Sequence, residues 1–203
     1  MRKGYTGCLT VCLAFVLLSM SMLGGCAKRD IEEGRDDMSG LEWQSVSSVD
    51  QEEAAEPVVF EGKDMEGNAV SSDIFGNAKI TMVNVWATYC NPCLREMPEL
   101  GELANEYEEG DFQLIGIISD VQEGAAQEDL DAAAKLIEQT KADYSHLLLN
   151  ESLYLALLME VRAVPTTFFI DEDGVVLDVV IGARDKTAWK EKIDGFLEEE
   201  QQE

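Results

Sequence analysis

The sequence predicts an α/β domain over residues 57–200, with a mixed central sheet flanked by helices. Apolar strand-like runs alternate with helical patterns from residue 80 onward. The two earliest runs are apolar on both sides, as central strands are. A hairpin pattern and a last helix then complete the domain, so the sheet cannot be purely parallel.

The first half of the domain contains a hairpin, two central strands and a helix. Residues 58–60 and 64–70 predict a short N-terminal hairpin with Gly67 and Asn68 at its turn. Residues 80–86 and 112–118 predict buried strands. Between them, residues 91–109 follow a helical pattern that ends at Gly110, and we expect Pro98 to bend it. Its inward face is predicted to hold Leu94, Met97, Leu103, Ala104 and Tyr107.

The second half begins with an amphipathic helix marked by Leu130, Ala133, Ala134 and Ile137. Residues 147–149 predict a short strand, and Asn150 is a candidate cap for a helix that runs to about residue 160. Residues 166–170 and 175–181 predict a hairpin through the turn 171–174. The last helix is expected to start at Asp185, with Trp189, Ile193, Phe196 and Leu197 facing inward.

The N-terminal 25 residues have the pattern of an export signal. Arg2 and Lys3 precede an uncharged apolar run, and small residues stand directly before Cys26. This resembles a lipoprotein signal, cleaved before Cys26, whose thiol then carries lipid. An uncleaved membrane helix and an ordinary secretory signal are the alternatives. All three place the domain at or beyond the extracytoplasmic face of the membrane, with the positive start inside.

Acidic residues dominate the rest of the chain. The chain has 15 basic and 41 acidic residues, which gives a net charge of −26. Such a surface repels nucleic acid and anionic lipid headgroups, so the sequence predicts no nucleic-acid partner. Membrane attachment is expected through lipid on Cys26, or otherwise through an apolar helix, and not through a basic patch. Residues 26–56 are acidic and poor in bulky apolar side chains, and we expect a disordered tether there.

Cys90 and Cys93 predict redox chemistry. They are two of five cysteines, and the other three lie in or at the end of the export segment. The spacing places both thiols on one helical turn, directly after a strand, where backbone N–H groups favour a thiolate at Cys90 and lower its pKa below about 8.5. Cys93 is expected to be the more buried, resolving thiol. A purely structural disulfide is the alternative, although so short a loop constrains the unfolded chain little.

The segment Trp86–Pro98, WATYCNPCLREMP, resembles the active-site segment of the TlpA-like and ResA-like membrane-anchored thioredoxins. Tyr89 stands where a second tryptophan is usual. Val164, Pro165 and Thr166 resemble the family's cis-proline loop, and Gly182 after the last strand also fits. The resemblance covers about residues 57–198. It implies a thioredoxin fold with a central helical insertion near 121–146.

The resemblance also implies an activity and a site. The activity is thiol–disulfide oxidoreduction outside the cytoplasm, in the reducing direction, with electrons passing from a membrane thiol carrier to disulfides of clients such as apocytochrome c. Pro165 is expected beside Cys90 as part of the catalytic set, with a cis peptide bond that presents the backbone of Val164 to a client. The expected binding residues are Trp86, Tyr89, Asn91, Pro92, Val164 and Thr166.

Glu96 stands three residues after Cys93, on the same helical face. In the resembled family a glutamate here lies near the buried thiol, where a desolvated carboxylate exchanges the Cys93 proton. The alternative is a solvated acid in the first turns of a helix. Asn84 occupies the strand position where cytoplasmic thioredoxins carry a buried aspartate, which increases the importance of Glu96.

Two other functions share the cysteine pair. A copper-delivering thioredoxin-like protein uses two cysteines three residues apart plus a distant histidine, whereas here the gap is two residues. The single His146 falls in the insertion and is expected to be a surface or loop residue rather than a ligand. A peroxiredoxin-like peroxidase would need a threonine three residues before its cysteine, whereas Thr88 is two before Cys90. We therefore expect no metal and no cofactor beyond the Cys90–Cys93 disulfide.

Overall fold

Five strands form the central sheet of the computed structural model, which describes residues 56–200. The strands are β3 (Ile80–Trp86), β4 (Phe112–Gln122), β5 (Ser145–Leu149), β6 (Thr166–Asp171) and β7 (Val176–Ile181). The helices are α1 (Asn91–Leu103), α2 (Gln127–Thr140), α3 (Glu151–Leu153) and α4 (Lys186–Glu200). The N-terminal hairpin is made of β1 (Glu61–Lys63) and β2 (Ala69–Ser71). The predicted order of elements is confirmed.

The sheet order is β5-β4-β3-β6-β7, with β3, β4 and β5 parallel and β6 and β7 antiparallel to their neighbours. Every residue of β3 is buried, as expected for the central strand. Its register pairs Trp86 with Ile118 and Val85 with Thr166. The C-terminal end of β3 therefore lies beside the start of β6, and the site forms at this end of the sheet.

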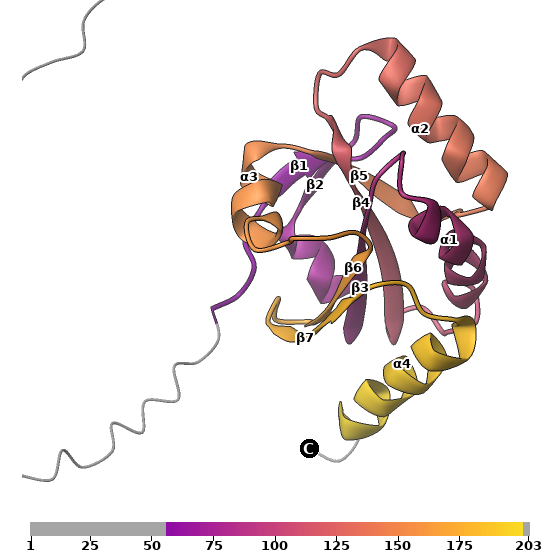
Figure 1. Cartoon of the computed structure of the whole chain (residues 1–203). Coiled ribbons are helices and arrows are strands. Elements are labelled where there is room, and N and C mark those ends of the chain that lie inside the picture. The colour runs from indigo at the N-terminus through magenta and orange to yellow at the C-terminus, as the bar shows by residue number, and fades with distance from the viewer. Residues whose placement is uncertain (1–55, 201–203) are drawn as a thin grey trace, which may run out of the picture. The chain divides into compact units, whose positions relative to one another are not determined.

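Helices α1, α2 and α4 lie on one side of the sheet, and α3 and the N-terminal hairpin on the other (Figure 1). On the first side, Leu100 and Leu103 of α1 pack with Trp189 and Ile193 of α4. Phe60 and Phe75 belong to the cluster on the second side, with ring centroids 5.8 Å apart. Both faces of the sheet are therefore covered.

The N-terminal hairpin turns where the sequence predicts, although its strands begin later. Gly67 has a φ of 85°, a conformation that glycine adopts without steric cost. The Asp64 carboxylate accepts the backbone N–H of Asn68 at 2.7 Å and so fixes the turn. Upstream, the N–H of Val58 donates to the carbonyl oxygen of Gly174 at 2.8 Å, which ties the start of the domain to the β6–β7 turn.

Helix α1 ends at Leu103, six residues before the predicted Glu109. The Asn105 side chain donates to the carbonyl oxygen of Gly101 at 2.8 Å, which is the acceptor that the Asn105 backbone would need to continue the helix. Gly101 itself is required by crowding, because a Cβ there would lie 2.4 Å from the carbonyl oxygen of Lys141.

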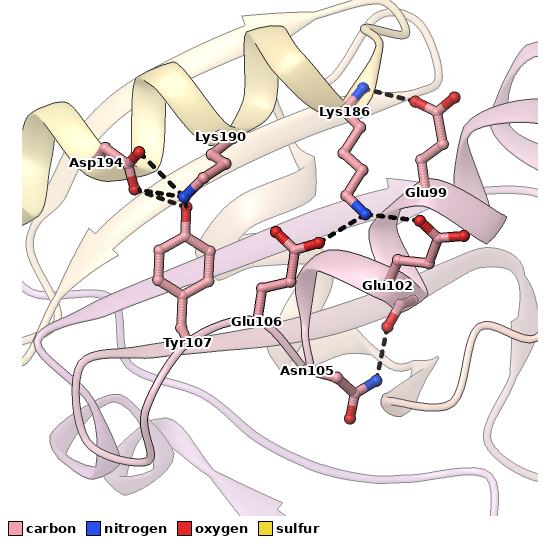
Figure 2. Close-up of polar contacts among 9 residues, drawn as sticks. Glu99, Glu102, Asn105, Glu106, Tyr107, Lys186, Lys190 and Asp194 are labelled. Carbon is pink, nitrogen blue, oxygen red and sulfur yellow. Dashed lines mark hydrogen bonds and ion pairs between the residues drawn. The ribbon is translucent and has the colours of Figure 1, made fainter.

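Acidic side chains of α1 and of the segment that follows it hold the start of α4 (Figure 2). Lys186 Nζ pairs with Glu102 at 2.6 Å and with Glu106 at 2.7 Å. The backbone N–H of Lys186 donates to Glu99 at 2.6 Å. Further along, the Tyr107 hydroxyl donates to Asp194 at 2.9 Å. These contacts fix the loop before α4 against α1, and this loop also reaches the site.

Two further predictions need correction. The helix capped by Asn150 does not run to residue 160 as an α-helix, because α3 passes at once into a π-helical turn, Tyr154–Leu158. The cap itself is present, with Asn150 Oδ1 accepting the N–H of Leu153 at 2.8 Å. In α2, Ala133 is buried as expected but Ala134 is exposed.

The predicted export signal, Cys26 and the tether lie outside the described residues. Between residues 56 and 200, none of the helices has both the length and the apolar character needed to cross a membrane.

Candidate active site

Cys90 and Cys93 form a disulfide where β3 gives way to α1. Three residues, Ala87, Thr88 and Tyr89, separate the end of β3 from Cys90. Cys90 is the N-cap of α1 and its Sγ accepts the N–H of Cys93 at 3.3 Å. The N–H donors at the start of a helix favour negative charge, so this position stabilises a thiolate once the bond is reduced.

Both cysteines are buried in the disulfide form. Cys90 is 5% exposed and Cys93 is 0% exposed, so Cys93 is the more buried of the two, as predicted. Cys90 and Cys93 pack in one apolar cluster with Trp86, Ala87 and Met97.

The Val164–Pro165 peptide bond is cis, as the resemblance implies. Two hydrogen bonds brace this loop: the Thr166 hydroxyl donates to the Ala163 carbonyl at 2.7 Å, and the Gly182 N–H donates to the Pro165 carbonyl at 2.8 Å. Val164 packs against the cluster that contains both cysteines. The loop is thus rigidly placed next to the disulfide.

Glu96 is buried, so the solvated interpretation of this residue is wrong. It is 3% exposed. Asn84 Nδ2 donates to its Oε1 at 3.2 Å, and the Arg184 N–H donates to its Oε2 at 3.2 Å. Burial raises the pKa of Glu96, and the hydrogen bonds from Arg184 and Asn84 offset part of that rise. Glu96 is thus a buried carboxyl group with a raised pKa, three residues after Cys93 in α1, which is the kind of group that serves in acid–base chemistry.

Three buried polar atoms of residues 56–200 have no hydrogen-bond partner: Asn84 Oδ1, the Tyr144 hydroxyl oxygen and Trp189 Nε1. All three residues influence or are influenced by Glu96. Asn84 and Trp189 lower its pKa, and burial followed by the Glu96 charge raises the pKa of Tyr144. Unpartnered polar groups are costly in a core and are few in native proteins. Neither Tyr144 nor Trp189 carries a sequence signal that would have placed it here.

His146 corrects a prediction, because it is a buried residue of β5 and not a surface or loop residue. It is 2% exposed. The Trp86 indole N–H donates to its Nδ1 at 3.1 Å, so the ring proton is on Nε2, which donates to the Ala142 carbonyl at 3.0 Å. Burial lowers the pKa of His146 to about 4, against the opposing effect of the Ala142 carbonyl. Both ring nitrogens of His146 are therefore engaged in hydrogen bonds within the protein.

The predicted binding residues divide into two groups. Tyr89, Asn91 and Pro92 are exposed around the disulfide, and Val164 is partly buried beside it. Trp86 is 0% exposed and Thr166 is 2% exposed, so neither can contact a client; they hold the two loops in place. The Thr88 hydroxyl donates to Asp120 at 2.5 Å, away from any role at the sulfur.

Comparison with known proteins places this arrangement among redox proteins. A model of the AhpC/TSA family matches residues 53–179. The thiol-disulfide oxidoreductase ResA of Bacillus cereus (strain ZK / E33L) is 29% identical over 136 residues, or 66% of this chain and 70% of that protein. The thiol:disulfide interchange protein DsbE of Pseudomonas fluorescens biotype C is 33% identical over 115 residues, or 57% of this chain and 58% of that protein.

Solved structures show the same fold. A thiol:disulfide interchange protein of the thioredoxin family from Chlorobium tepidum TLS has a TM-score of 0.60 and 24% identity, covering 70% of this chain and 96% of its own. A secreted disulfide oxidoreductase of Mycobacterium tuberculosis has a TM-score of 0.54 and 16% identity, covering 67% and 95%. The predicted thioredoxin-like fold is therefore confirmed.

Proposed function

Because the chain belongs to the AhpC/TSA family and is a thiol–disulfide oxidoreductase, we propose that it reduces disulfides of exported client proteins from a lipid anchor on the membrane. The observation that carries the proposal is the Cys90–Cys93 disulfide at a helix N-terminus beside a cis-proline loop. The secreted protein of similar fold and the export signal both support a site outside the cytoplasm.

The proposed exchange starts from the reduced protein. The Cys90 thiolate attacks one sulfur of a client disulfide, which forms a mixed disulfide and releases the other client sulfur as a thiolate that takes a proton. Glu96 accepts the proton of Cys93, and the Cys93 thiolate then attacks the Cys90 sulfur. The second client sulfur leaves, the Cys90–Cys93 disulfide forms, and two electrons have passed to the client. A membrane thiol carrier then reduces the disulfide again.

The backbone of Val164 is proposed to hold the client chain. Val164 lies outside the helices and strands. Within residues 56–200, neither its N–H nor its carbonyl oxygen forms a hydrogen bond with another backbone group. Exposed Tyr89, Asn91 and Pro92 would surround the client sulfur on the other side. Pro165 lacks an N–H, so it leaves this edge open to an extended peptide.

Trapping of clients tests the roles of the two cysteines. Cys93→Ser should accumulate mixed disulfides through Cys90, because the resolving step is lost while the attacking thiol remains. Cys90→Ser is the matched control and should trap far less. Equal trapping by both variants, measured on non-reducing gels, would overturn the assignment of roles.

Direction and anchoring need separate measurements. Reduction potentials of related proteins span about −270 to −120 mV, and a redox titration of the Cys90–Cys93 pair near the low end is the expected result for a reductase. A value near the high end would indicate an oxidase.

Cys26→Ala should move the protein from the membrane fraction to the soluble extracytoplasmic fraction; retention in the membrane would exclude lipid on Cys26 as the anchor.

A further inference from the structure

A pocket of about 260 Å³ opens next to the disulfide. Its walls include Tyr89 from the active-site loop and Val164 from the cis-proline loop. The opposite wall consists of Leu149 at the end of β5, and Tyr154 and Leu158 from the π-helical turn. Pockets for small-molecule ligands are commonly about 300–1,000 Å³, so this one is of a size for a single large side chain. It is lined by Tyr89, which directly precedes Cys90, and by Val164 of the cis-proline loop, so it adjoins the site.

Apolar side chains are exposed at the pocket. Tyr89 is 73% exposed and Tyr154 is 46% exposed, and both line it. Leu155 and Met159, on the same segment as Tyr154, are 57% and 48% exposed. Large exposed apolar groups that gather in one place commonly mark a binding surface. The chemistry at this wall fits an apolar or aromatic side chain.

Arg162 supplies a positive charge at the same pocket. Its guanidinium donates to the Met159 carbonyl and to the Glu160 carboxylate, both at 3.0 Å, and its side chain is 73% exposed. An arginine has five N–H donors, so others stay available for a second carboxylate, for which Glu160 competes. In a strongly acidic chain, this arginine is a local exception. At physiological salt, exposed charges act over only about 8 Å, so the charges nearest the pocket decide its preference.

We propose that this pocket selects clients by the residues beside their reactive cysteine. It takes a large apolar side chain between Tyr89, Tyr154 and Leu158, while Arg162 favours a carboxylate next to it. The proposal rests on the proposed function, since the occupant is the client segment whose disulfide meets Cys90. An extended chain held along Val164 would bring the neighbouring side chain to the pocket, because Val164 belongs to both.

Four matched peptides test the proposal with the full chain in detergent solution. Each peptide carries one internal disulfide, with phenylalanine or serine beside the attacked cysteine and aspartate or lysine next in line. The measured quantity is kcat/KM for reduction of each peptide. We expect phenylalanine to be preferred over serine by about tenfold, the size of effect that an apolar pocket gives, and aspartate over lysine by a smaller factor.

Two variants connect these preferences to the pocket. Ala163→Phe adds a large side chain to the lining and should bring the phenylalanine-to-serine ratio close to one. Arg162→Glu should remove or reverse the aspartate-to-lysine ratio. Ratios taken on one preparation cancel any loss of folded protein or any general change at Cys90. Ala132→Phe and Lys135→Glu, exposed on α2, are the matched controls and should keep both ratios.

The outcomes separate this proposal from the proposed function. The protein is first assayed with neutral 2-hydroxyethyl disulfide, whose reduction reports the proposed function alone. If the unmodified protein reduces that compound, and reduces all four peptides at rates equal to one another, the function stands and the pocket proposal is wrong. The same conclusion follows if the two pocket variants keep the preferences, or if Ala163→Phe instead dissociates a dimer of this chain. If the reduced protein reduces no disulfide at all, the proposed function fails and the pocket proposal fails with it.

Discussion

The Trp86 indole and the His146 imidazole are joined by a hydrogen bond of 3.1 Å that spans the strand between them. Trp86 ends β3, His146 lies on β5, and Gly116 of β4 pairs with His146 in the sheet register. The tryptophan that precedes the disulfide loop is thereby fixed by a residue distant in sequence. Tyr144 extends the arrangement, with its ring centroid 4.4 Å from that of His146.

Stability should fall on acidification because of His146. Its pKa is about 4 in the folded protein and 6.5 in its unperturbed form, so between these values the unfolded chain binds a proton that the folded protein does not. The free energy of unfolding should therefore decrease from pH 6.5 to 4 by up to about 3 kcal/mol from this residue. Urea unfolding across that range should show a shallower dependence for His146→Phe; equal slopes would contradict the prediction.

Gly116→Ala should destabilise the fold. A Cβ at Gly116 would lie 2.2 Å from Nδ1 of His146, a distance that forces the ring out of its hydrogen bond with Trp86. Overpacking of this kind costs about 1–3 kcal/mol. Gly195→Ala in α4 is the matched control, since nothing lies within 4 Å of its Cβ and alanine favours a helix. Thermal unfolding of both variants checks this, and a neutral Gly116→Ala would contradict it.

Two tyrosines should respond differently to loss of the hydroxyl group. Tyr144→Phe removes a buried oxygen without a partner and should be neutral or stabilising. Tyr107→Phe removes the donor to Asp194 and should cost on the order of 1 kcal/mol. Urea midpoints of the two variants give the comparison. A marked loss in Tyr144→Phe would show that ordered water satisfies that hydroxyl.

Glu96→Gln should stabilise the protein at neutral pH while slowing exchange. The folded pKa of Glu96 is raised, so the folded state is favoured when the carboxyl is protonated and loses stability as pH rises through that pKa. A neutral glutamine avoids this loss, although its single amide oxygen can accept only one of the two N–H groups, from Asn84 and Arg184, that the carboxylate accepts. The gain should be on the order of 1 kcal/mol at pH 7 and shrink below pH 4.5. Unfolding and insulin-reduction assays on the same samples measure both effects, and a destabilised variant would contradict the expectation.

The sequence predicts the order of elements well because its central strands have strong local signals. Residues 80–86 are apolar on both sides, and the Asp171–Gly174 turn joins two clear strands. The end of α1 is not predictable in this way. It depends on the Asn105 side chain taking the carbonyl of Gly101, a competition that hydrophobic periodicity does not reveal.

The cysteine pair is evident from spacing, but its buried surroundings are not. Glu96 is compatible in sequence with either a solvated or a buried acid, and the deciding N–H comes from Arg184, 88 residues away. His146 likewise carries no periodic signal, and its burial depends on Trp86 and on space above Gly116. Such long-range partners are set by packing, which a single sequence does not specify.

The hydrogen bond from the Val58 N–H to the Gly174 carbonyl oxygen fixes the point at which the chain enters the domain. Gly174 follows β6, whose other end lies beside Trp86 and the cysteines, so the polypeptide enters the domain at the pole remote from the sulfurs. Val58 and the disulfide thus lie at opposite ends of β6, so the start of the domain does not cover the sulfurs.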